Sequence, residues 1–240
     1  MNAKVIRLFL LGTENGVGWC VPYVHYLEGL GTIGRAKIPG VGVDVSPIKT
    51  TPKYEALNLS GKYRIPLFQL VYHDAVFCTF RWEFTPDRYE NAELWKKQDL
   101  ITMMYGYMPI FVENFESLRQ RGQMIKQSVA AVLSWREKIG MDELVDHKSL
   151  TDDRMVQVSK FSSGYAIIVN FSEDRTIVLS NDEGIAPLSY FVYKWTDMPE
   201  LHVDPPRQSS LPTHCRRNIV TECRSLPHNV CYRRELLPEE

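Results

Sequence analysis

A glutamate followed by aromatic side chains stands near the start of this chain of 240 residues. Glu14 comes directly after a short apolar run, in a segment with glycines, and Trp19 and Tyr23 follow it. Apolar faces of sugar rings stack on aromatic side chains, and a carboxylic acid partly removed from water keeps its proton closer to neutral pH. These three residues are therefore candidates for a sugar site in which Glu14 transfers a proton. The alternative is a surface carboxylate beside core aromatics.

A second polar group follows another apolar run, residues 65–72. His73 and Asp74 come directly after it, and Trp82 lies a few residues further on. Asp74 could bind a sugar hydroxyl, ligate a hard cation such as calcium, or orient His73. A buried His–Asp pair with no further role is the alternative. Residues 105–109 form a third candidate segment, whose tyrosines could equally belong to the core.

The elements that would position these residues alternate along the first part of the chain. The pattern predicts strands over 5–11 and 65–72 and helices over 91–105 and 113–138, with Gly140 as a helix stop. Such alternation is typical of parallel strands joined by crossovers, where functional groups collect at the carboxyl ends of the strands. We therefore expect Glu14 and Asp74 to lie at the same rim of one sheet.

The periodicity changes near residue 150. Short apolar runs at 155–161, 165–171 and 175–179 are separated by turn residues and predict an antiparallel β module. The last segment has no lysine but six arginines and three of the five cysteines, which indicates a flexible tail or non-native coding sequence. The predicted organisation is therefore 1–143, 144–204 and an irregular tail over 205–240.

Composition narrows the function classes. The chain has 28 basic and 29 acidic side chains and a formal net charge of -1, which argues against nucleic acid or an anionic membrane as partner. We find no signal peptide or transmembrane pattern and expect a soluble protein whose compartment and oligomeric state stay open. The cysteines form no CxxC pair, so a zinc ribbon is not supported.

Several short motifs together resemble one enzyme family. They are Gly12 to Trp19 (GTENGVGW), residues 64–74 with Trp82, Tyr105-Gly106, residues 150–157 and residues 169–171. In this order they resemble the C-terminal half of the glycoside hydrolases related to families 101 and 129. The resemblance implies an α/β plus β fold, with a partial (β/α)8 barrel followed by an antiparallel β-sandwich-like module.

The resemblance also implies an activity and site roles. Those families are retaining enzymes that release α-linked N-acetylgalactosamine from glycans. By its place in the motif, Glu14 resembles the general acid/base, and Asp74 resembles a carboxylate that binds sugar or a metal such as calcium. Trp19, Tyr23, His73 and Trp82 would then contact a glycan substrate.

One departure from the family concerns the nucleophile. The family's nucleophilic aspartate lies on an earlier barrel strand, and Glu14 has too few residues before it for such a strand. We therefore expect a fragment of a retaining glycoside hydrolase that is inactive, or nearly so, by itself. The alternatives are a non-catalytic carbohydrate-binding protein and an unrelated α/β enzyme that uses His73 and Asp74 as a catalytic base pair.

Overall fold

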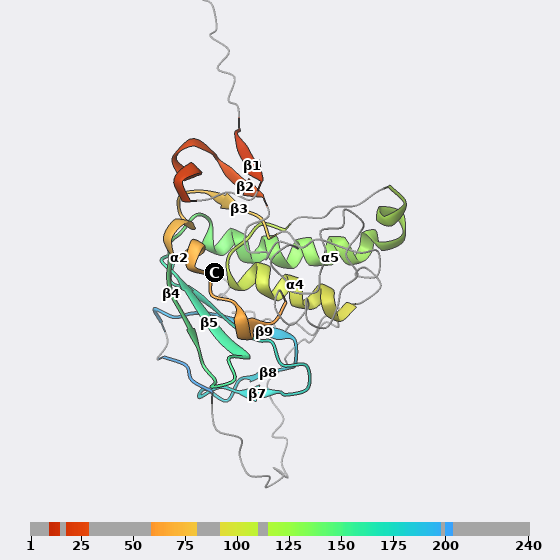
Figure 1. The fold of residues 1–240 in the computed structure, drawn as a ribbon. Helices are drawn as coiled ribbons and strands as arrows, with labels where there is room; N and C mark the ends of the chain where they lie inside the picture. The colour runs from red at the N-terminus through yellow and green to blue at the C-terminus, as the bar shows by residue number, and fades with distance from the viewer. Residues whose placement is uncertain are drawn as a thin grey trace, which may run out of the picture.

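A computed structural model describes residues 10–14, 18–28, 59–80, 92–109, 115–197 and 200–203 (Figure 1). In chain order, the elements of the first part are β1 (Gly12–Glu14), the 3-10 helix η1 (Gly18–Tyr23), β2 (Tyr26–Glu28), the 3-10 helix η3 (Gly61–Tyr63), α2 (Leu67–Tyr72), β3 (Phe77–Cys78), α4 (Ala92–Met104) and α5 (Phe115–Ile139). The strands that follow are β4 (Leu144–Ser149), β5 (Val156–Phe161), β6 (Tyr165–Asn170), β7 (Ile177–Val178), β8 (Gly184–Ile185) and β9 (Ser189–Lys194). Trp82, residues 5–9 and the tail over 205–240 lie outside the described residues.

The three N-terminal strands form a short parallel sheet in the order β1-β2-β3. Beyond β3, the segment at Met108 takes the next strand position of this sheet. Its amide donates to the Cys78 carbonyl at 2.7 Å, and Thr79 forms a parallel bridge with Met108. The described strands thus confirm the predicted mixture of helix and parallel sheet. They form an open sheet, and no closed barrel is seen among the described residues.

The strand predicted over 65–72 is wrong, because α2 forms there. The helix starts directly after Pro66, and its period of 3.6 residues buries Gln69 and His73 on one side while Leu67 and Val71 are exposed. A short apolar run suits a buried strand or a buried helical turn equally well, so its periodicity does not separate the two. The strand comes later instead, at β3.

Four antiparallel strands make the second sheet, in the order β4-β5-β6-β9, and β7 and β8 form a separate hairpin. The predicted antiparallel module is confirmed by this sheet, although β4 and β9 were not predicted. Strand β6 is apolar on both faces because both are covered. Ile167 and Val169 join the core shared with the helices, whereas Ala166 and Ile168 pack in a second cluster with β7 and β8.

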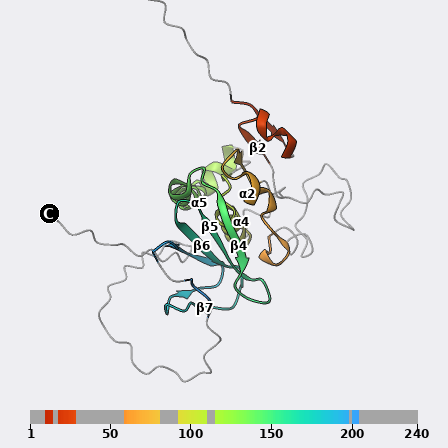
Figure 2. The ribbon, with the colours of Figure 1, turned by 90° about the vertical axis from the view of Figure 1, so that its left-hand side faces the viewer.

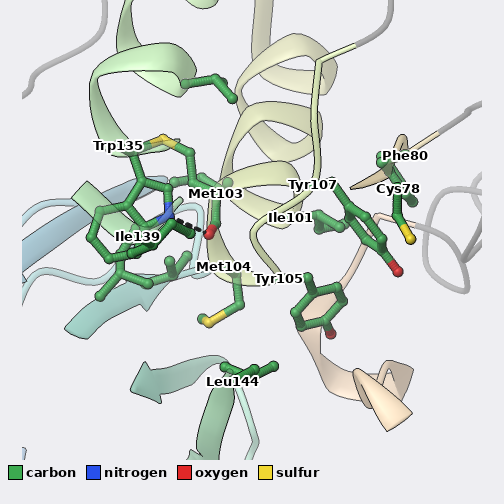
Figure 3. Close-up of a cluster of buried hydrophobic side chains, with 14 of the residues drawn as sticks. Cys78, Phe80, Ile101, Met103, Met104, Tyr105, Tyr107, Trp135, Ile139 and Leu144 are labelled. Carbon is green, nitrogen blue, oxygen red and sulfur yellow. Dashed lines mark hydrogen bonds between the residues drawn. The ribbon is translucent and has the colours of Figure 1, made fainter. Parts of the chain in front are cut away.

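Helices α4 and α5 cover one face of this antiparallel sheet (Figures 1 and 2). At their contact, the Trp135 indole N–H donates to the Met103 carbonyl at 2.8 Å (Figure 3). The Trp135 ring also meets the Phe161 ring edge-on at 5.6 Å. Helix α5 ends at the predicted stop, where Gly140 has a φ of +47° that favours glycine. Among the described residues, no helix is long and apolar enough to span a membrane.

Candidate functional site

Two glutamates end neighbouring parallel strands. Glu14 is the last residue of β1, Glu28 is the last residue of β2, and the two are directly paired in the register. Neighbouring strands lie about 4.8 Å apart, so the backbone brings two carboxylate-bearing positions together at the carboxyl end of the sheet. Thr79 follows β3 at the same end. In parallel sheets this end is where ligands and catalytic groups collect.

Glu28 is a position at this end of the sheet that the sequence did not predict. The signal was the alternation of Tyr26, Leu27 and Glu28 just before a glycine, which is a strand pattern too short to stand out. Pairing with β1 and β3 makes these three residues a strand. The position of Glu28 therefore depends on its neighbours in the sheet.

An aromatic face lies on the strands below these two positions. Tyr26 and Phe77 are paired in the register and are 42% and 44% exposed, whereas Leu27 and Cys78 are buried on the opposite face. A Cβ at Gly12 would lie 2.1 Å from the Tyr26 ring, so only glycine leaves room for that ring over β1. Successive residues of a strand alternate between faces, so the positions of Glu14, Glu28 and Thr79 belong to the face with the exposed aromatics.

Helix η1 carries two further aromatic residues directly after β1. Trp19 is 77% exposed and Tyr23 is 71% exposed, while Cys20 and Val21 between them are buried and fix the helix on the core. This placement excludes the alternative in which Trp19 and Tyr23 are core aromatics. Two large apolar surfaces are thus open to solvent on the segment that follows Glu14.

His73 lies in the core. It is 3% exposed, its Nδ1 faces the Asp142 carbonyl, and Arg136 donates to its Nε2 at 2.8 Å and to the Gly106 carbonyl at 2.6 Å. Since a guanidinium is only a donor, Nε2 accepts and Nδ1 carries the proton that is donated to Asp142. Burial lowers the pKa of His73, which keeps the ring neutral. His73 therefore links the end of α2 to α5 and to the start of the antiparallel sheet.

Asp74 is exposed in the turn after α2. A catalytic His73–Asp74 pair would need a hydrogen bond between the two side chains, but the ring nitrogens of His73 face Asp142, Gly106 and Arg136 instead. The expected common rim of Glu14 and Asp74 is wrong. Phe77, three residues after Asp74, aligns with Gly12 and Tyr26, so Asp74 precedes β3 at the amino end of the sheet while Glu14 ends β1 at the carboxyl end. The physical reason is that residues 65–72 form a helix and not a strand. The residues after this helix therefore lie before the next strand, β3, and not after a strand end.

Asp74 also has no partners for a metal among the described residues. No group of three or more His, Cys, Asp or Glu side chains in this part of the chain could hold a metal ion together. The described surroundings of Asp74 therefore do not fit a calcium site, and we derive no step through a metal. Calcium stays a prediction from the sequence.

The third candidate segment, residues 105–109, supplies core residues. Tyr105 and Tyr107 are buried and meet edge-on at 5.9 Å, and burial raises the pKa of Tyr105 to about 12. The Arg64 guanidinium lies over the Phe80 ring at 4.8 Å beside them. Their phenols stay protonated at neutral pH. These tyrosines therefore belong to the core, which was the alternative for this segment.

Comparison with known proteins gives one family match. The model of the glycosyl hydrolases related to GH101 family, GH129, matches residues 37–160, just over half of the chain. No curated protein matches the chain.

Among solved structures, the matches include three of the alpha-N-acetylgalactosaminidase NagBb from Bifidobacterium bifidum. Its quadruple mutant is 19% identical with a TM-score of 0.44 and covers 75% of this chain and 24% of its own. The GalNAc complex is 20% identical with a TM-score of 0.44 and covers 68% and 23%, and the ligand-free form is 21% identical with a TM-score of 0.42 and covers 68% and 22%. The chain thus spans about a quarter of the length of these enzymes.

Proposed function

The chain belongs to the glycosyl hydrolases related to GH101 family, GH129, and from this premise we propose that it carries the acid/base carboxyl and an aromatic wall of a retaining glycosidase site. The proposed substrates are glycans with α-linked N-acetylgalactosamine or a similar sugar. The observation that carries the proposal is the place of Glu14 at the carboxyl end of a parallel strand. Strands β1, β2 and β3 and the bridge at Met108 would then be consecutive strand positions of a (β/α)8 barrel.

The proposed chemistry gives Glu14 two proton transfers. As an acid it protonates the oxygen of the departing aglycone, and as a base it takes a proton from the water that releases the sugar. Retaining hydrolysis also needs a second carboxylate that attacks the anomeric carbon. We assign that nucleophile to polypeptide outside this sequence, so the chain alone would bind the glycan without turning it over.

Trp19 and Tyr23 are proposed to stack on sugar rings. Both are more than two-thirds exposed on η1, whose buried residues Cys20 and Val21 hold it in place. A rigid aromatic platform beside an acid/base group orients the glycosidic bond at little entropic cost. Trp82 is proposed for the same role on sequence grounds alone.

The test of the acid/base role compares two leaving groups in a longer protein that contains this sequence. Glu14→Gln should slow hydrolysis of a substrate with a sugar leaving group by a factor of about 100 or more, and a nitrophenyl-type substrate far less, because only the poor leaving group needs the proton. Glu137→Gln, an exposed change on α5, is the control and should affect neither substrate. Equal losses on both substrates after Glu14→Gln would rule out the acid/base role.

A non-catalytic carbohydrate-binding function is the second candidate, and the exposure of Trp19 and Tyr23 favours it. It would show as calorimetric binding of an N-acetylgalactosamine glycoside to the 240-residue chain, lost in Trp19→Ala and kept in Tyr63→Ala, an exposed aromatic on η3. Binding of this kind without any turnover in the longer protein would favour this candidate over the enzyme. Binding that survives Trp19→Ala would exclude η1 as the sugar platform.

A further inference from the structure

We infer that His73 and Arg136 form a pH-dependent switch: when the His73 ring takes up a second proton, the Arg136 guanidinium leaves the core and the C-terminal end of α5 is released from α2. The basis is a shared acceptor, because both side chains face the Gly106 carbonyl. The switch concerns the joint between α2, α5 and β4 and does not depend on the proposed glycosidase site.

With a neutral His73 ring, Arg136 holds this joint together. Its Nη1 donates to the His73 Nε2 at 2.8 Å and to the Gly106 carbonyl at 2.6 Å. The other ring nitrogen, Nδ1, donates to the carbonyl of Asp142, just before β4. The end of α2, the end of α5, the residues after α4 and the start of the antiparallel sheet are thus joined through two buried side chains.

A second proton on His73 removes the basis of this arrangement. The ring Nε2 would become a donor that faces the Nη1 donor of Arg136 at 2.8 Å, with two positive charges in contact away from water. The Gly106 carbonyl lies 3.2 Å from Nε2 and can accept its proton. The imidazolium therefore keeps two carbonyl acceptors, whereas Arg136 loses one acceptor and is repelled.

Arg136 has little else to keep it in the core. Its Nη2 contacts the Met141 sulfur at 3.9 Å, and among the described residues no carboxylate forms an ion pair with it. It lies in the last turn of α5, next to the exposed Glu137 and Lys138, so the path of its long side chain to water is short. Hydration of the released guanidinium favours the open state.

The groups that act on the His73 ring couple its protonation to this release. Burial is the largest cause that lowers the pKa of His73, and the Arg136 charge lowers it further, while the hydrogen bonds to the Asp142 and Gly106 carbonyls and the Asp142 charge raise it. The Phe161 ring of β5, edge-on to the imidazole at 5.0 Å, carries no charge. Departure of Arg136 lets the pKa of His73 rise, so protonation and release favour each other.

The other titratable groups of the neighbouring elements have other surroundings. Burial raises the pKa of the Cys78 thiol on β3 to about 12, so this group is neutral. The polar side chains of β4 have partners on β5 or after β9: His147 with Ser159, Asp146 with Lys160, and Lys148 with Glu200. Asp74 and Glu143 are exposed. Arg136 is therefore the charge that decides the state of His73.

Two backbone hydrogen bonds report the release of α5. The Gly140 amide donates to the Arg136 carbonyl at 2.7 Å, and the Asp142 amide donates to the Ile139 carbonyl at 2.9 Å. Both lie in the turn that the Arg136 side chain ties to His73. Below the ordinary imidazole value of 6.5, the population of the open state rises by up to about tenfold for each pH unit, and amides in this turn lose protection from hydrogen exchange by the same factor.

The experiment compares the full chain at pH 7 and pH 4.5 by 15N NMR. Long-range spectra of the imidazole nitrogens report the protonation of His73, and hydrogen exchange corrected for its intrinsic pH dependence reports the Gly140 and Asp142 amides. Between the two pH values the ring should become doubly protonated. The two amides should then lose protection about tenfold or more relative to the amides of β6, which report global unfolding.

His73→Gln keeps an acceptor for Arg136 and cannot take up a proton, so the selective loss of protection should disappear in this variant. His147→Gln, a change at the other buried histidine, is the matched control and should retain it. A wild-type ring that stays neutral at pH 4.5, or a doubly protonated ring without selective loss at Gly140 and Asp142, overturns the inference even if His73→Gln does not fold. A selective loss that persists in folded His73→Gln also overturns it.

Discussion

His147 should make the protein lose stability in mild acid. It lies on β4 with its Nδ1 3.0 Å from the Ser159 hydroxyl of β5 and its ring edge-on to Tyr105 at 5.7 Å. Burial lowers the pKa of His147 from 6.5 to about 4, against a smaller opposing effect of the Gln157 side chain, which can accept a hydrogen bond from the protonated ring. The folded protein therefore holds this imidazole neutral at a pH where the unfolded chain binds a proton.

The size of the effect follows from the two pKa values. The contribution is complete above pH 6.5 and is lost as the pH falls toward 4, because only the unfolded state takes up the proton in that window. Each pH unit corresponds to about 1.4 kcal/mol, so the free energy of unfolding should fall by about 2.5 kcal/mol between pH 7 and pH 4.5. The pKa of His73 is also lowered by burial, so His73 adds a loss of the same sign.

The assay is urea unfolding of the full chain at pH 7 and pH 4.5, in the wild type and in His147→Gln. The variant should lose about 2.5 kcal/mol less than the wild type between the two pH values, whatever its stability at pH 7. His202→Gln, a change at an exposed histidine, is the control and should behave as the wild type. The reasoning would be refuted if the wild type and His147→Gln lost the same stability on acidification.

Three core substitutions should change the midpoint of thermal unfolding in different directions. Gly106→Ala should lower stability by about 2 kcal/mol or more, because Gly106 has a φ of +67° and its Cβ would lie 2.2 Å from the His73 ring; a change below about 0.5 kcal/mol would contradict this packing. Trp135→Phe should cost about 0.5–1.5 kcal/mol through the lost indole hydrogen bond, because the Met103 carbonyl keeps the Gly106 amide as a second donor at 3.1 Å; an unchanged midpoint would exclude the indole hydrogen bond. Gln69→Met should be neutral or stabilising, since both amide atoms of Gln69 are buried with no partner at hydrogen-bond distance and have only the Cys78 thiol and the Tyr107 phenol nearby; a large loss would show that one of these two contacts is a hydrogen bond.

The sequence predicted the elements whose signal is long and local. Helices α4 and α5 and the turn at Gly140 came from apolar spacing over many residues and from one glycine. The antiparallel strands β5 and β6 came from apolar runs bounded by turn residues. In these segments the repeat is long enough to decide the secondary structure without knowledge of any neighbour.

The prediction that Glu14 and Asp74 lie at one rim of the sheet is wrong for a reason that is also local. Residues 65–72 are too few to show a period, and their conformation is decided by packing, which buries Gln69 and His73 on one side of a helical turn. Once α2 forms, Asp74 lies before β3 instead of after a strand. One wrong element thus placed Asp74 at the other end of the sheet and His73 in the core.

The amino-acid sequence by itself determined the family motifs, the acidic and aromatic character of the segment from Glu14 to Tyr23, and the long helices, because these depend on residue type and short-range spacing. Only the tertiary structure decided that Glu14 pairs with Glu28, that His73 is held by Arg136, and that Asp74 lies apart from both glutamates. Strand register and side-chain partners join residues distant in the chain, and they are set by the packing of the whole core.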